Sequence, residues 1–178
     1  MSRTLVENLR QQIQGAHQFI SGTMADVTSE QAHWQPPGTA NPIGAQYAHV
    51  LTSEDGVVNG LIRQAAPLFA SDYAGRAGFN APPPAATDEG LPDWHEWAGN
   101  VEVDLDQLRE YASAVHAKTD AFLATLTDED LAKPLSHPAA GETTVGYMLN
   151  IAVLGNTQWH CGEISCLKGI QGGKGYPV

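Results

Sequence analysis

Apolar residues spaced three and four positions apart are the feature that most limits the fold of this chain. In residues 4–24 the spacing is carried by a single stripe: Leu5, Leu9, Ile13, Ala16, Phe19 and Ile20. The same spacing returns in residues 42–63, from about residue 93 to residue 126, and in residues 143–169. It places apolar side chains on one face of an α-helix. No segment has the alternating pattern of a half-buried strand, so we predict an all-α protein, a four-helix bundle.

Capping residues and breakers mark the ends of these segments. Thr28 and Gln31 predict a capping box for a short turn after the first helix. Asn41 and Pro42 predict the start of the second helix, because asparagine is a good N-cap and proline suits the first helical position. "TSEQAHWQPP" and "TDEDLAKPL" share a threonine cap, an acidic turn and a proline stop. The chain therefore resembles two helix hairpins built alike.

About 30 residues, "QAAPLFASDYAGRAGFNAPPPAATDEGLPD", separate the second and third helices. Links of this length are uncommon inside a compact domain. A helix of 20 residues is only about 30 Å long, so the link can run the length of the bundle. Helices two and three can then lie parallel, with a long crossover joining the two hairpins.

Length and charge limit the classes of partner. The 178 residues fit one domain, residues 1–178. The net charge of −11, from 20 acidic and 9 basic side chains, repels phosphate backbones and anionic lipids, so we expect neither nucleic acid nor membrane as a partner. No apolar run approaches the roughly 20 residues that span a bilayer, and the N-terminus has no apolar signal-peptide core. We expect a cytoplasmic protein in which Cys161 and Cys166 are reduced thiols.

Two of the seven histidines, His49 and His160, lie well inside apolar helical windows on different helices. Asn156, His160 and Glu163 are spaced at i, i+4 and i+7, so they share one helix face. The same spacing assigns four further residues to this face: Ala152, Val153, Trp159 and Leu167. We expect the face to point into the bundle. Facing helices build metal sites in bundles, and zinc and nickel accept neutral imidazole. The polar trio is either a mutually satisfied core network or the floor of a site.

Other candidate groups carry weaker signals. Cys161 is turned about 100° from His160 and lies mid-helix, which argues against a nucleophilic role. We expect residues 53–55, "SED", to form a solvated helix edge, with a polar rim near His49 as the alternative. The aromatic segment "DWHEWAG" is expected to cover one end of the bundle or to form a lid.

The segments "YAHVLTSEDGVVNGLI" around His49 and "WHCGEISCLKG" around His160, with the tail "GGKGYP", resemble the DinB/YfiT-like superfamily. The resemblance spans nearly the whole chain, including the long crossover. It implies a down-up-up-down four-helix bundle with the crossover between helices 2 and 3, and frequent homodimers. It also implies a divalent metal, zinc or nickel, held by three histidines. Characterised members include transferases and an isomerase that act with low-molecular-weight thiols.

Carried over residue by residue, the resemblance gives the metal ligands as His49, Asn156 and His160. Asn156 stands where the family has a histidine, and an amide oxygen is a weaker ligand for zinc or nickel than an imidazole nitrogen. Glu163 can add a ligand, orient His160 from the second shell, or accept a proton in catalysis.

Two functions remain open. The first is a metal-dependent enzyme of the thiol-transferase or hydrolase type, with a divalent metal at His49, Asn156 and His160 and with Glu163 as the catalytic proton acceptor. The second is a non-catalytic dimeric bundle, structural or binding a small-molecule ligand, that has lost full metal ligation. Asn156 favours the second, whereas polar groups at all three ligand positions favour the first.

Overall fold

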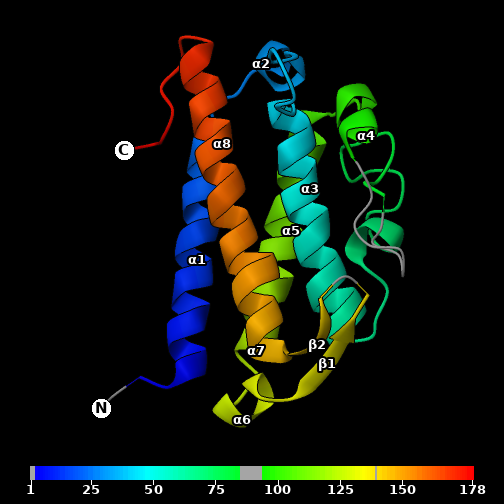
Figure 1. The fold of residues 1–178 in the computed structure, drawn as a ribbon, viewed down its shortest axis with the longest axis vertical. Helices are drawn as coiled ribbons and strands as arrows, with labels where there is room; N and C mark the ends of the chain where they lie inside the picture. Colours follow the sequence, from blue (N-terminus) through cyan, green and yellow to red (C-terminus); the bar gives the residue numbers. More distant parts are fainter. Residues whose placement is uncertain (1–2, 85–93, 139) are drawn as a thin grey trace.

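A computed structural model describes residues 3–84, 94–138 and 140–178, and these residues are mostly helical. The long helices α1, α3, α5 and α8 lie side by side, with short elements at both ends (Figure 1). Helix α1 packs against α5 and α8, and α3 also packs against α5 and α8. The helical elements are α1 (Leu5–Met24), α2 (Ser29–His33), α3 (Ile43–Asp55), α4 (His95–Asn100), α5 (Leu105–Leu123), α6 (Asp128–Leu131), α7 (Val145–Met148) and α8 (Asn156–Ile170).

Two π-helical stretches widen the bundle helices. The stretch η1 (Gly56–Ile62) continues α3, and η3 (Leu149–Gly155) joins α7 to α8. The two stretches contact each other. A short 3₁₀ turn, η2 (Leu68–Ala70), follows in the crossover. π-helical turns are often found at functional sites. The space between α3 and α8, where η1 and η3 meet, is therefore a candidate site.

The predicted caps form, with one shift in position. Thr28 and Gln31 make a capping box at α2, and Thr127 makes one with Asp130 at α6. Helix α3 has Pro42 as its N-cap and begins at Ile43, one residue later than Asn41 and Pro42 predict. Asp128 accepts hydrogen bonds from the first backbone N–H groups of α1, at 3.2 and 3.0 Å. One end of α1 is thereby fixed to α6.

The structure agrees with the predicted helical fold but adds one short β-hairpin that the sequence did not indicate. Strands β1 (Pro134–His137) and β2 (Gly141–Thr144) form an antiparallel hairpin, with Pro134 opposite Thr144. Each strand has four residues and no buried side chain, so no apolar alternation could reveal it. The hairpin lies at one end of the bundle beside α7 (Figure 1).

The predicted third helix is two elements, since α4 ends before Asp104 caps α5. The earliest predicted start of the third helix, residue 93, lies outside the described residues. Gly78 in the crossover has φ +87°, and a Cβ there would meet the Leu108 backbone nitrogen at 2.4 Å. The residue must therefore be glycine for the crossover to lie against α5.

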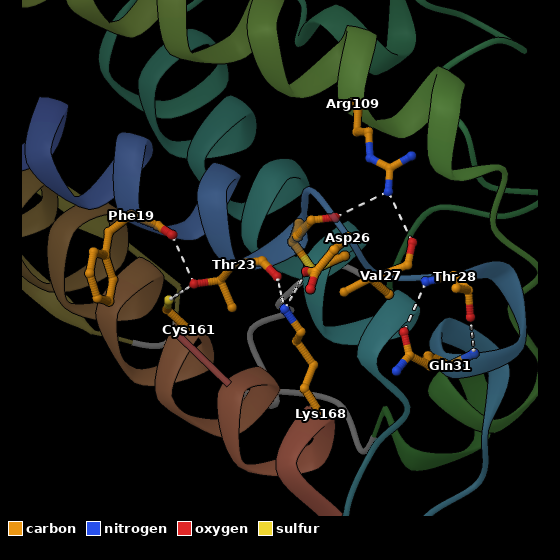
Figure 2. A network of polar contacts seen from close by, with 10 residues as sticks. Phe19, Thr23, Asp26, Val27, Thr28, Gln31, Arg109, Cys161 and Lys168 are labelled. Atoms are coloured by element: carbon orange, nitrogen blue, oxygen red, sulfur yellow. Dashed lines mark hydrogen bonds and ion pairs between the residues drawn. The ribbon is translucent and has the colours of Figure 1, made fainter. Parts of the chain in front are cut away.

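Polar contacts hold the C-terminal end of α1 against its neighbours, as Figure 2 shows. The buried Lys168 on α8 donates to the Thr23 carbonyl at 2.6 Å and to Asp26 Oδ1 at 2.5 Å. Its hydrogen bond lowers the pKa of Asp26. Arg109 on α5 donates to the carbonyls of Met24 and Val27. These bonds satisfy carbonyls that the end of a helix leaves without intrahelical partners.

Candidate functional site

A cavity of about 600 Å³ lies between α3, the η3–α8 helix, the crossover and the hairpin. His49 and Thr52 of α3 line it on one side, and Asn156 and His160 of α8 line it on the other. Much of the remaining wall is apolar: Val57, Leu61, Phe69, Pro83, Pro84, Trp94, Tyr147, Met148, Ile151, Ala152 and Trp159. The size and lining are those of a small-molecule site with a few polar groups.

The structure brings His49 and His160 together across this cavity. Their ring centroids are 5.0 Å apart, and the rings meet edge to face. Burial and the neighbouring His160 lower the pKa of His49 to about 4, although a hydrogen bond with the Asn156 side chain acts in the opposite direction. His49 is therefore neutral at physiological pH, the form in which imidazole binds a metal.

Asn156 lies one helical turn before His160 and beside His49. Its Nδ2 atom is buried and has no hydrogen-bond partner among the described residues. An amide nitrogen only donates hydrogen bonds, so a metal ion at this wall would be bound by Asn156 Oδ1 and not by Nδ2.

Glu163 and Trp159 do not share the inward face that their spacing predicts. Glu163 Oε2 lies 2.7 Å from His160 Nδ1, but its side chain is 57% exposed and does not line the cavity. Trp159 lines the cavity rim and is 59% exposed. With Nδ1 engaged by the carboxylate, Nε2 is the His160 nitrogen left to bind a ligand, an arrangement typical of metal-bound histidines.

Trp94, at the start of α4, covers His49 from the crossover side. The two rings stack with centroids 4.1 Å apart, and Trp94 lies 6.0 Å from the His160 ring. Trp97 contacts Trp94 and donates to the Ala81 carbonyl at 3.0 Å. The described part of the aromatic segment therefore covers the histidine pair. The first residue of the segment, residue 93, lies outside the described residues.

The donor set of the cavity fits a divalent ion in part. Two imidazole nitrogen donors and an adjacent amide suit zinc or nickel, whose sites commonly use imidazole. His137 of β1 also lines the cavity, and its Nδ1 accepts a hydrogen bond from the Ala140 backbone N–H at 3.1 Å, while Asn156 adds only a weak amide donor beside the two imidazoles. Open positions would therefore face the apolar cavity, where a ligand can enter.

A second group of side chains was not predicted from the sequence. His17 of α1, Glu54 of α3 and His116 of α5 offer ligand atoms that all lie within 4.8 Å of one another. His17 Nε2 is 2.9 Å from Glu54 Oε2, and Thr119 donates to Glu54 Oε1 at 2.6 Å. The His17 and His116 rings stack with centroids 3.8 Å apart and planes 7° apart. These three side chains can hold a metal ion.

The expectation of a solvated edge at residues 53–55 was wrong for its two acidic members. Glu54 is 1% exposed and Asp55 is fully buried, where it accepts from Tyr111 and from the Phe69 backbone N–H. The signal was present, because Glu54 follows Val50 and Leu51 by four and three residues on the same face. His17 likewise falls between Ile13 and Ile20 on the apolar stripe of α1.

Cys161 lines a smaller cavity of about 410 Å³ between α1 and α8. It contacts Thr23 Oγ1 at 3.4 Å, and burial raises the pKa of its thiol. A raised pKa disfavours the thiolate that a nucleophile needs, in agreement with the sequence analysis. Cys161 and Cys166 are both free. Among the described residues, no helix is long and apolar enough to cross a membrane.

Comparison with known proteins agrees with this architecture. The family model of the DinB superfamily matches residues 9–164. The crystal structure of a conserved protein from Enterococcus faecalis matches with a TM-score of 0.74 and 17% identity, covering 96% of this chain and 99% of that chain. At that identity the similarity shows the fold alone. No curated protein matches the chain.

Proposed function

Because the chain belongs to the DinB superfamily, we propose that its cavity binds a divalent metal ion and a small molecule. His49 and His160 are the principal ligands, and Asn156 is the weak third ligand. The observation that carries this proposal is the meeting of two imidazoles, one from α3 and one from α8, in the lining of one cavity. The activity would be that of a metal-dependent enzyme of the thiol-transferase or hydrolase type. Zinc and nickel are the metals that this donor set favours.

A divalent ion in this position would favour the thiolate form of a bound thiol and polarise a carbonyl group. The residues around it have separate tasks. The lowered pKa of His49 keeps its lone pair available, and Glu163 holds the orientation of the His160 ring. The Trp94 ring shields His49 from water. The apolar wall would receive the non-reacting part of an organic substrate.

The catalytic role of Glu163 belongs to the same proposal. A proton acceptor must reach the reacting group within hydrogen-bond distance, directly or through one water. Glu163 points away from the described cavity wall, so its direct action on a substrate would need a water or a rotation of the side chain. Its bond to His160 favours a positioning role for this carboxylate.

The test is metal analysis of protein purified without an affinity tag, before and after incubation with zinc or nickel. We expect near-stoichiometric uptake, and loss of the cavity-bound equivalent in the His49→Ala and His160→Ala variants. A His95→Ala variant is the matched control, because His95 is an exposed histidine of α4. If both cavity variants bind as much metal as the parent protein, the proposed site is wrong.

The alternative is a non-catalytic ligand-binding or structural bundle, favoured by the amide at position 156. Its histidines would serve as hydrogen-bonding groups in an apolar pocket. Absence of metal from the cavity at micromolar zinc and nickel would favour this alternative. The down-up-up-down helix order and homodimerisation are also parts of the proposal and rest on the family resemblance, whereas a cytoplasmic location rests on the N-terminal sequence and the two thiols.

A further inference from the structure

We propose that His17, Glu54 and His116 form a second metal site, separate from the cavity, that binds a zinc-class divalent ion between α1, α3 and α5. The site does not depend on the proposed function of the cavity. Glu54 lies five residues after His49, which turns it about 140° around α3, away from the cavity. His17 and His116 come from helices that do not line the cavity.

The buried charge of Glu54 is the first argument. Its side chain is 1% exposed, and a carboxylate in that environment needs a positive partner to remain ionised. His17 Nε2 lies 2.9 Å from Glu54 Oε2, and Thr119 donates to Oε1 at 2.6 Å, so both carboxylate oxygens have close polar partners. The protein is therefore arranged to keep a negative charge in its interior. A bound cation neutralises that charge.

The unpaired nitrogen of His116 is the second argument. Its Nε2 atom is buried and has no hydrogen-bond partner among the described residues. The His116 ring stacks on the His17 ring with centroids 3.8 Å apart, which places it beside the other two donors. An imidazole with a free buried nitrogen is a ready metal ligand.

The chemistry of the donors indicates the ion. Two imidazole nitrogens and one carboxylate oxygen make the set found in His₂Glu zinc sites. A divalent transition ion is therefore favoured over calcium or magnesium, which prefer oxygen ligands. Thr119 donates to the Glu54 oxygen that does not face His17, and so fixes the carboxylate from behind.

The distances show what must move on binding. Ligand atoms about 2.1 Å from a tetrahedral zinc ion lie about 3.4 Å apart. The His17–Glu54 pair, at 2.9 Å, is already close enough, whereas the widest separation in the group reaches at most 4.8 Å. His116 is the residue free to move, because it is the least buried of the three and its Nε2 has no partner. Binding should therefore tilt this ring out of its stack on His17.

The experiment uses the tag-free full chain with the cavity histidines removed, His49→Ala/His160→Ala. We would titrate it with Co²⁺, whose visible absorption reports tetrahedral coordination, and then displace the Co²⁺ with Zn²⁺. The expected result is one bound equivalent per chain. Adding His116→Gln should weaken Co²⁺ binding at least tenfold, while adding the control His95→Gln should change it less than twofold.

Two results would overturn the second site. One is no uptake of micromolar Co²⁺ or Zn²⁺ by the folded cavity variant, with folding checked by circular dichroism. The other is an affinity that His116→Gln leaves unchanged. If His116→Gln does not fold, zinc-edge X-ray absorption of the cavity variant decides the question. Two imidazoles with a carboxylate support the site, and any shell without two imidazoles refutes it. Because the tested variant lacks both cavity histidines, these results do not depend on whether the cavity proposal is correct.

Discussion

The protein contains two groups of histidines that differ in access and in charge. His49 and His160 meet at the wall of a cavity, and the described cavity wall carries no acidic side chain. His17 and His116 are packed around a carboxylate, Glu54, in the interior between three helices. The first group is open to ligands and contacts no buried carboxylate, whereas the second is enclosed and surrounds the buried carboxylate of Glu54.

The difference in burial gives the two groups different roles, ligand binding for the first and stability for the second. The cavity imidazoles can be replaced without leaving a buried carboxylate unpaired, because Glu163, the carboxylate that contacts His160, is 57% exposed. A buried carboxylate allows no such freedom, because its partners are needed to offset the loss of hydration. We therefore expect substitutions at the cavity to change binding, and substitutions around Glu54 to change the stability of the fold.

The largest expected effect comes from removing the partner of the buried carboxylate. His17→Leu removes the partner of the buried Glu54 Oε2, which lies 2.9 Å from His17 Nε2, and should lower the free energy of unfolding by about 3–5 kcal/mol. The measurement is urea unfolding in the presence of a chelator. His49→Leu, which leaves no charge unpaired, should cost less.

The control for His17→Leu removes both partners. His17→Leu/Glu54→Leu replaces the pair by apolar groups and should be more stable than His17→Leu alone. A single variant that loses less than about 1 kcal/mol would break the contrast between the two groups, because the carboxylate would then tolerate the loss of its partner.

A somewhat smaller effect is expected on lowering the pH, and here the two groups should behave alike. The pKa values of His49 and His116 are both lowered to about 4 from an ordinary value of 6.5. The unfolded chain therefore binds more protons than the folded one between these values, and stability falls as the pH drops from 6.5 to 4. The loss reaches at most about 3 kcal/mol for each histidine.

Urea unfolding at a series of pH values in a chelator measures this loss. His49→Gln and His116→Gln should each make the dependence shallower over that window. A free energy of unfolding that stays constant from pH 6.5 to 4 would contradict the neutral, buried state of both rings.

The smallest effect concerns the cavity alone. Asn156→His restores a third imidazole and should tighten zinc or nickel binding tenfold or more, about 1.4 kcal/mol. Competition with a chromophoric chelator measures the affinity, and the stability of the metal-free protein should change little. Unchanged affinity would mean that position 156 does not take part in the cavity site.

Local periodicity predicted the helices, and the family resemblance implied that His49 and His160 meet across two of them. His49 and His160 lie in apolar windows. The four-residue spacing between Asn156 and His160 indicates that these two share one helix face. The same reasoning was available for His17 and Glu54, whose neighbours three and four residues away are apolar. Their pairing across helices has no local signal, because α1, α3 and α5 meet only in the folded chain. Glu163 shows the converse, since its i+3 spacing from His160 predicted contact correctly and burial wrongly.

The π-helical stretch η3 ends directly before Asn156, so it sets the rotation of α8 relative to α7. Hydrogen bonds in a π-helix span one residue more than those of an α-helix, so the stretch has the effect of an inserted residue. Deleting a single residue there would rotate Asn156 and His160 about 100° relative to α7. A change in chain length, with every ligand retained, is therefore sufficient to abolish the cavity site.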